Sequence, residues 1–155
     1  MELDDLIGAY QRAATAFARG NPEPVKALWA REDDVVLANP FGPAVRGWTA
    51  AAEALESASS RFRDGDAVVF ERVAEYRCAD LAVIHDVERW RAKVGASSEA
   101  SELILRVTST FRRGPDGWGL VHRHADTISA ADPSGRLPGN ESPSDRSRDH
   151  GGRQT

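Results

Sequence analysis

The sequence predicts an α+β protein in which three helices come before a curved, mostly antiparallel sheet and pack on one of its faces. Two observations support this prediction. Apolar residues recur at helical spacing in the first part of the chain, and from Ala67 onward long runs rich in β-branched and aromatic residues replace them. The grouping of helices before strands indicates the α+β class.

The first helix is expected from Leu3 to Phe17, where apolar side chains recur every three or four residues until Gly20-Asn21-Pro22 ends the pattern. A short second helix is expected near Pro24, because the first turn of a helix tolerates proline. A brief strand from Val35 to Ala38 is expected next, before a turn-rich segment. A third, alanine-rich helix is then expected from about Trp48 to Phe62.

Four long strands are expected after the helices, with short turns rich in glycine, serine and aspartate between them. Consecutive antiparallel hairpins are the simplest way to pair such strands. They are expected at Ala67–Arg77, Leu81–Val94, Leu103–Arg113 and Trp118–Ile128.

The last part of the chain differs in composition, since it is rich in proline, glycine, serine and mixed charges and almost free of aliphatic residues. Such a segment cannot bury enough apolar surface to fold. We therefore expect a single domain over residues 1–130 and a disordered tail over residues 131–155.

Composition excludes several classes of function. A formal net charge of -4 leaves no excess of positive charge for nucleic acid. The single cysteine, Cys78, allows no intramolecular disulfide and fits a reducing cytoplasm. The chain has neither a signal peptide nor an apolar run of about twenty residues, so a cytoplasmic protein without a membrane partner is expected.

The last predicted strand carries the clearest candidate chemistry. Alternation places His122, His124 and Asp126 on the same side as Trp118 and Leu120. A face that begins apolar and ends in two imidazoles and a carboxylate is typical of a pocket. These three polar residues are therefore the candidate catalytic acid/base groups. The alternatives are hydrogen-bonded structural histidines with a solvated carboxylate, or a zinc site.

Other residues are candidates for binding a ligand. Glu88 and Arg106 lie on adjacent predicted strands and could form a cross-strand ion pair that grips a polar group, although alternation favours the outer face for Arg106. Asn39 could offer a donor and an acceptor to a ligand, or could bond its own backbone in a turn. Four aromatic residues could line a core or a pocket: Phe41, Trp48, Phe62 and Trp90.

Several strings resemble the SnoaL-like, ketosteroid-isomerase-like group of the nuclear-transport-factor-2-like superfamily. The resemblance covers roughly Leu3 to Ile128, and the strings that carry it are Asp80-Leu81-Ala82-Val83-Ile84, Leu105-Arg106-Val107-Thr108, Phe111-Arg112-Arg113 and Val121-His122-Arg123-His124-Ala125-Asp126. It implies a cystatin-like α+β cone, in which a strongly bent sheet wraps the helices and leaves an open pocket. It also implies frequent homodimers through the outer sheet face.

Members of this group include isomerases, cyclases, hydrolases, dehydratases and binding modules, which generally work without a metal, so the resemblance implies no single activity. The two tyrosines, Tyr10 and Tyr76, match no string of the isomerases' oxyanion hole. We expect a protein that binds a small, mostly apolar molecule in the pocket. It would be either a cofactor-independent isomerase, cyclase or related acid/base enzyme, or a non-catalytic module for ligand binding or dimerisation. An accessory subunit of a larger assembly is a third alternative.

Overall fold

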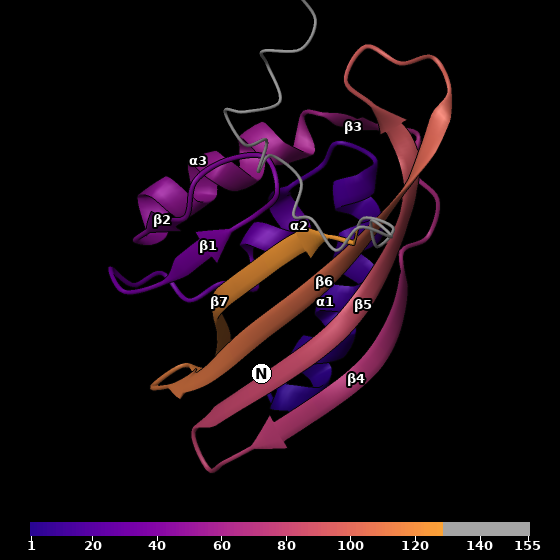
Figure 1. Cartoon of the computed structure of the whole chain (residues 1–155). Coiled ribbons are helices and arrows are strands. Elements are labelled where there is room, and N and C mark those ends of the chain that lie inside the picture. Colours follow the sequence, from indigo (N-terminus) through magenta and orange to yellow (C-terminus); the bar gives the residue numbers. More distant parts are fainter. Residues whose placement is uncertain (129–155) are drawn as a thin grey trace, which may run out of the picture.

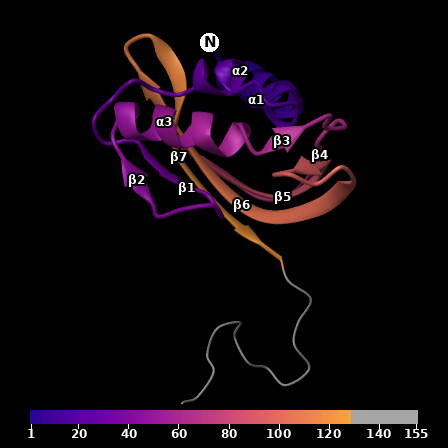
Figure 2. The same cartoon turned by 90° about the horizontal axis from the view of Figure 1, so that it is seen from above.

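The computed structural model of the chain describes residues 1–128. Helices cover one face of a strongly curved sheet, and the long strands run beneath them (Figure 1; Figure 2). This arrangement confirms the predicted α+β class with helices before strands. The predicted disordered tail, residues 131–155, lies outside the described residues.

Three helices form where the apolar spacing predicts them. Helix α1 runs from Leu3 to Ala18 and buries one stripe of side chains, and α2 is a single turn from Glu23 to Lys26 that contains Pro24 in its first turn. Helix α3 runs from Trp48 to Ser59, so it ends three residues before the predicted end at Phe62. The reason is that Phe62 belongs to a short strand.

The sheet has seven strands. The bounds are β1 Val36–Ala38, β2 Val45–Arg46, β3 Phe62–Arg63, β4 Val69–Arg77, β5 Leu81–Val94, β6 Ala100–Gly114 and β7 Gly117–Thr127. The two-residue strands β2 and β3 were not expected from the sequence. All the pairings are antiparallel except that of β1 with β7, and both β3 and β4 pair with β5.

Alternation along β5 defines the two faces of the sheet. The even-numbered residues from Ala82 to Ala92 are buried under the helices, whereas the odd-numbered residues are exposed or half-buried on the opposite side, called the outer face from here on. Irregular pairing interrupts β4 between Arg72 and Ala74, and a second irregularity lies where Thr110 and Phe111 of β6 meet β7. Bulges of this kind increase local twist and bend a sheet. The curvature visible in Figure 2 encloses the helices on the concave face.

The core lies between the helices and the concave face and draws its side chains from α1, α2, α3 and the long strands. Gly65, between β3 and β4, lets the chain approach α1 closely, because a Cβ atom there would come within 2.4 Å of the carbonyl oxygen of Ala18. No helix among residues 1–128 is long and apolar enough to cross a membrane.

Candidate functional site

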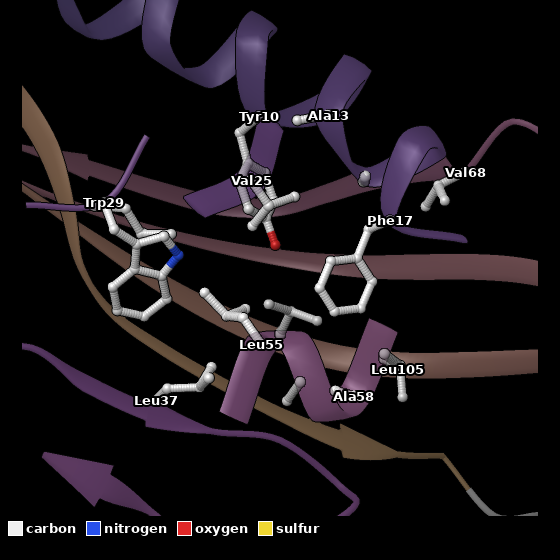
Figure 3. Close-up of a cluster of buried hydrophobic side chains, with 14 of the residues drawn as sticks. Tyr10, Ala13, Phe17, Val25, Trp29, Leu37, Leu55, Ala58, Val68 and Leu105 are labelled. Carbon is white, nitrogen blue, oxygen red and sulfur yellow. The ribbon is translucent and has the colours of Figure 1, made fainter. Parts of the chain in front are cut away.

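A narrow cavity opens between α1, α3 and the concave face of the sheet. Figure 3 shows side chains of α1 and α3 reaching toward the same space as Leu37 and Leu105 of the sheet. Most of the lining is apolar. The lining residues are Tyr10, Ala14, Phe17, Val25, Leu37, Asn39, Leu55, Ala58, Phe62, Trp90, Leu105 and Arg123.

The polar end of the cavity is a buried hydrogen-bonded network. The Arg123 guanidinium donates from Nε to the Tyr10 hydroxyl oxygen at 2.6 Å and from Nη2 to Glu88 Oε2 at 2.8 Å. The Trp90 indole N–H donates to the same Glu88 oxygen at 2.9 Å. These four residues come from α1, β5 and β7 and are all buried. We call them the Arg123 network.

The ionised groups of the Arg123 network are buried and paired with each other. Glu88 is 1% exposed and Arg123 is 8% exposed, so each charge depends on the other for compensation. Burial by itself lowers the pKa of Arg123, but the Glu88 carboxylate and the Tyr10 hydroxyl outweigh that effect and raise it, so the guanidinium remains charged. Burial also raises the pKa of Tyr10, which therefore remains a neutral hydroxyl.

Asn39 bonds its own backbone, which is one of the two alternatives that the sequence left open, and a contact with a ligand remains a prediction. Its Oδ1 accepts a hydrogen bond from the backbone N–H of Phe41 at 3.0 Å, as expected for a turn, and the residue also lines the cavity. Phe41 packs against Phe62, with ring centroids 5.7 Å apart. The centroid of the Phe62 ring lies 5.7 Å from that of Trp90, and Phe62 and Trp90 form one side of the cavity wall, whereas Phe41 does not line the cavity.

The predicted placement of three residues of β7 in the cone pocket is wrong. His122, His124 and Asp126 lie on the outer face, where they pair across the strands with Thr110, Thr108 and Arg106. The cause is the bulge between β6 and β7. Phe111 of β6 pairs with Leu120 and the adjacent Thr110 pairs with His122, so Val121 is an extra residue in the ladder.

The extra residue reverses the alternation along β7. Leu120 and Val121 are both buried, and beyond them Arg123 and Ala125 point inward instead of the histidines. On the outer face, His124 Nε2 lies 3.3 Å from Asp126 Oδ2, and both side chains are more than half exposed. Partial burial, with the neighbouring His124 charge, lowers the pKa of His122. A catalytic role for these outer residues remains a prediction.

The expected cross-strand pair of Glu88 with Arg106 is also wrong. Glu88 pairs with Leu105 and faces the core, whereas Arg106 pairs with Val87 and is exposed on the outer face. The outer position that alternation favoured for Arg106 is therefore confirmed. Trp48 is half-buried near the edge of the core, with the Arg31 guanidinium 4.9 Å from its ring centroid, and does not line the cavity.

Sequence reasoning missed the two residues that give the cavity its polarity. Tyr10 lies on the apolar stripe of α1, which indicates burial but not what its hydroxyl meets. Arg123 shares a strand face with Val121 and Ala125, and a single arginine on such an apolar face is a signal of a buried, paired charge. Over the described part of the chain, no group of three His, Cys, Asp or Glu side chains could hold a metal ion.

We expect Glu88→Gln to destabilise the fold by about 3 to 5 kcal/mol, because an uncompensated guanidinium would remain buried. The measurement is the free energy of unfolding from urea denaturation. The matched control is Glu71→Gln, which removes an exposed carboxylate 3.8 Å from Arg89 on the neighbouring strand and should change the stability little. Equal stability of the two variants would contradict the structural role given to the Arg123 network.

Solved structures share this architecture. A ketosteroid isomerase-like protein from Erwinia carotovora atroseptica is similar with a TM-score of 0.66 and 22% sequence identity, over 82% of this chain and 94% of that one. A nuclear transport factor 2-like superfamily protein from Salmonella enterica serovar Typhimurium has a TM-score of 0.68 and 17% identity, over 86% and 93% of the two chains.

An NTF2-like protein with a cystatin-like fold from Novosphingobium aromaticivorans has a TM-score of 0.61 and 22% identity, over 81% of this chain and 79% of that one. Identities this low show a common fold and do not show a common activity. Among curated proteins, none matches the sequence. The family model described as a SnoaL-like domain matches residues 7–129. Together with the helices enclosed by a bent sheet, that match shows that the chain belongs to the SnoaL-like domain family.

Proposed function

We propose that this protein binds a small, mostly apolar molecule in the cavity between α1, α3 and the concave face. The observation that carries the proposal is the lining itself, in which aliphatic and aromatic side chains surround a few polar groups. Cavities of this composition are typical of small-molecule sites, where apolar walls supply affinity and a few polar groups fix orientation.

The buried ion pair adds support for a binding role. A core that served only for stability would gain little from Glu88 and Arg123, because hydrophobic side chains of similar volume often stabilise a fold as well as a buried ion pair does. Arg123 lines the apolar cavity and Glu88 is its buried partner, so the pair has a use in recognition. The similarity to the ketosteroid isomerase-like protein from Erwinia is consistent with a small-molecule pocket in this fold.

The proposal is for binding and does not include acid/base catalysis by His122, His124 and Asp126. These residues lie on the outer face, on the opposite side of β7 from Arg123, so they do not reach a molecule in the cavity. A cofactor-independent reaction in the cavity would have to use other groups.

A second proposal is a homodimer through the outer face. Large apolar side chains are exposed on the strands at one side of the sheet, including Val69, Tyr76 and Leu81, which are 58%, 67% and 41% exposed. Pairing across β4, β5 and β6 places Tyr76, Val83 and Thr110 side by side on this face. Exposed apolar area of this kind is a common site of association.

We expect that filling the cavity will abolish ligand binding. In Ala58→Met the longer side chain, from a buried position of α3, would occupy the cavity, whereas Ala96→Met changes only an exposed hairpin residue. The measurement is a thermal-shift screen with a library of small apolar molecules, in which a ligand at 100 times its Kd stabilises the folded state by about 2.7 kcal/mol.

Compounds that raise the melting temperature of the wild type and of Ala96→Met should leave Ala58→Met unchanged. Ala14→Leu, from α1, provides a second filled cavity if Ala58→Met does not fold. Equal shifts in the filled and control variants, or no shift in the wild type with any compound, would contradict ligand binding in this cavity.

We expect the wild type to sediment as a dimer of 16.8 kDa chains. Val83→Glu should shift it to a monomer, because a buried, unpaired carboxylate at the interface is costly. The control is Ala96→Glu, which adds the same charge on the hairpin between β5 and β6, away from the proposed interface. Sedimentation velocity distinguishes the states, and a monomeric wild type would contradict the dimer.

A further inference from the structure

We propose that the outer face is a pH-sensitive interface, on which two copies of this chain associate while His85, His122 and His124 are neutral and separate when these side chains take up protons. This inference rests on the proposed homodimer and names the condition that regulates it. It follows from where the three histidines lie on the face and from the charges that surround them.

The three histidines occupy two adjacent rows of the outer face, on strands that lie side by side in Figure 1. In one row, His85 of β5 pairs with Thr108 of β6, which pairs with His124 of β7. His122 lies in the next row, opposite Thr110. Neighbouring strands are about 4.8 Å apart, so the three imidazoles fall within a patch about 10 Å across. We call these three residues the histidine patch.

The histidine patch is continuous with the exposed apolar side chains of the proposed dimer interface. The row that contains His122 continues through Thr110 to Val83 of β5 and Tyr76 of β4. A stable interface buries about 800 Å² on each partner, which is more than a few apolar side chains supply. A second copy that covers Tyr76 and Val83 therefore also covers the imidazoles beside them.

While the histidines are neutral, the charges around the patch are balanced. Arg106 of β6 pairs across the strands with Asp126 of β7, so opposite charges are neighbours there. On the other side of the face, the Glu71 carboxylate of β4 lies 3.8 Å from the Arg89 guanidinium of β5. In a dimer with a two-fold axis, each copy presents the same surface to the other. A face that carries both signs in balance can oppose itself without net repulsion.

The direct cross-strand neighbours of the histidine patch cannot compensate a positive charge. They are uncharged side chains from β4, β6 and β1, namely Ala74, Thr108, Thr110, Val36 and Ala38. The Nδ1 atom of His85 lies 3.0 Å from the Thr108 hydroxyl oxygen, which can accept or donate but carries no charge.

The charged and titratable groups at the next positions of the outer face offer one counter-ion. These groups are Glu71 and Tyr76 of β4, Arg106 and Arg112 of β6, Asp126 of β7 and Arg46 of β2. Asp126 Oδ2 lies 3.3 Å from His124 Nε2, and no other carboxylate within residues 1–128 is at ion-pair distance from a histidine. Full protonation therefore adds three positive charges to each copy, of which Asp126 balances one.

Burial already disfavours the charged form of one member of the patch. Partial burial, with the neighbouring His124 charge, lowers the pKa of His122. A second copy on the outer face would bury this imidazole further and would act in the same direction. The dimer therefore binds protons more weakly than the separate chains do. The dimer is favoured above the pH range in which the separate chains titrate, and a fall in pH through that range favours separation.

The test measures the dissociation constant of the dimer of the full-length protein by sedimentation velocity, at about pH 7.5 and about pH 5.5, which lie on either side of the usual histidine titration. For each histidine per chain that stays neutral in the dimer, the two copies weaken association by about tenfold each per pH unit. We expect the dissociation constant to rise by at least about 100-fold. Far-UV circular dichroism at both values checks that the chain stays folded.

Glutamine variants identify the groups that titrate. A variant that combines His85→Gln, His122→Gln and His124→Gln should have nearly the same dissociation constant at both pH values, because glutamine is polar and takes up no proton. The matched control is His150→Gln, which removes the fourth histidine of the chain and lies outside the described residues. This control should keep the full rise in the dissociation constant.

A fixed charge tests the same mechanism without a change of pH, so the inference stays testable if acid unfolds the chain. We expect His122→Lys to be a monomer at about pH 7.5, because a buried ammonium without a partner is costly. The control is Ala96→Lys, which adds the same charge on the hairpin between β5 and β6 and should remain a dimer.

The contradicting results differ from those that would contradict the proposed dimer. The histidine mechanism would be overturned, with the dimer intact, by a dissociation constant that does not change with pH. A glutamine variant that keeps the full pH dependence, or a His122→Lys dimer as stable as the wild type, would overturn it in the same way. A wild type that is monomeric at both pH values would overturn both the mechanism and the dimer.

Discussion

The buried contact between Arg123 and Glu88 is the interaction on which the rest of the site depends. It joins β7 to β5 across β6, and through the Tyr10 hydroxyl it also ties α1 to the concave face. Each ionised group would be costly alone at this depth, so the pair fixes the relative position of the three elements that form the polar end of the cavity. Apolar walls surround the guanidinium where it lines the cavity, and in such an environment its hydrogen bonds are stronger than they would be in water.

The bulge at Val121 determines which chemistry faces inward. Without the extra residue, regular alternation from Leu120 would carry His122 and His124 into the cavity and Arg123 to the outer face. With it, Arg123 reaches Glu88 and the imidazoles lie among the threonines of β6 on the outer face. A single irregular pairing therefore separates a cavity of hydrogen-bond donors from an outer face that carries titratable groups.

The fold could be predicted from the sequence much better than the site could. Apolar spacing and turn residues located α1 and the long strands closely, and β5 has the predicted bounds, because these patterns depend on local backbone preferences and on burial. The bulge could not be predicted in the same way, because no residue near Val121 indicates it. The side chains of β7 beyond Val121 were therefore expected on the wrong face of the sheet. Tyr10 and Arg123 are 113 residues apart in the sequence, so their contact depends on the packed fold and not on a motif.

The most direct test of this account is a crystal structure of the protein with a bound compound that raises its melting temperature in the thermal-shift screen. We expect the apolar part of the compound to lie between α1, α3 and Leu105, with a polar atom about 3 Å from the Tyr10 hydroxyl or an Arg123 nitrogen. Glu88 should remain paired with Arg123 in the complex. Density for the compound on the outer face beside His122 and His124, or a polar group of the compound directed away from the Arg123 network, would contradict the account.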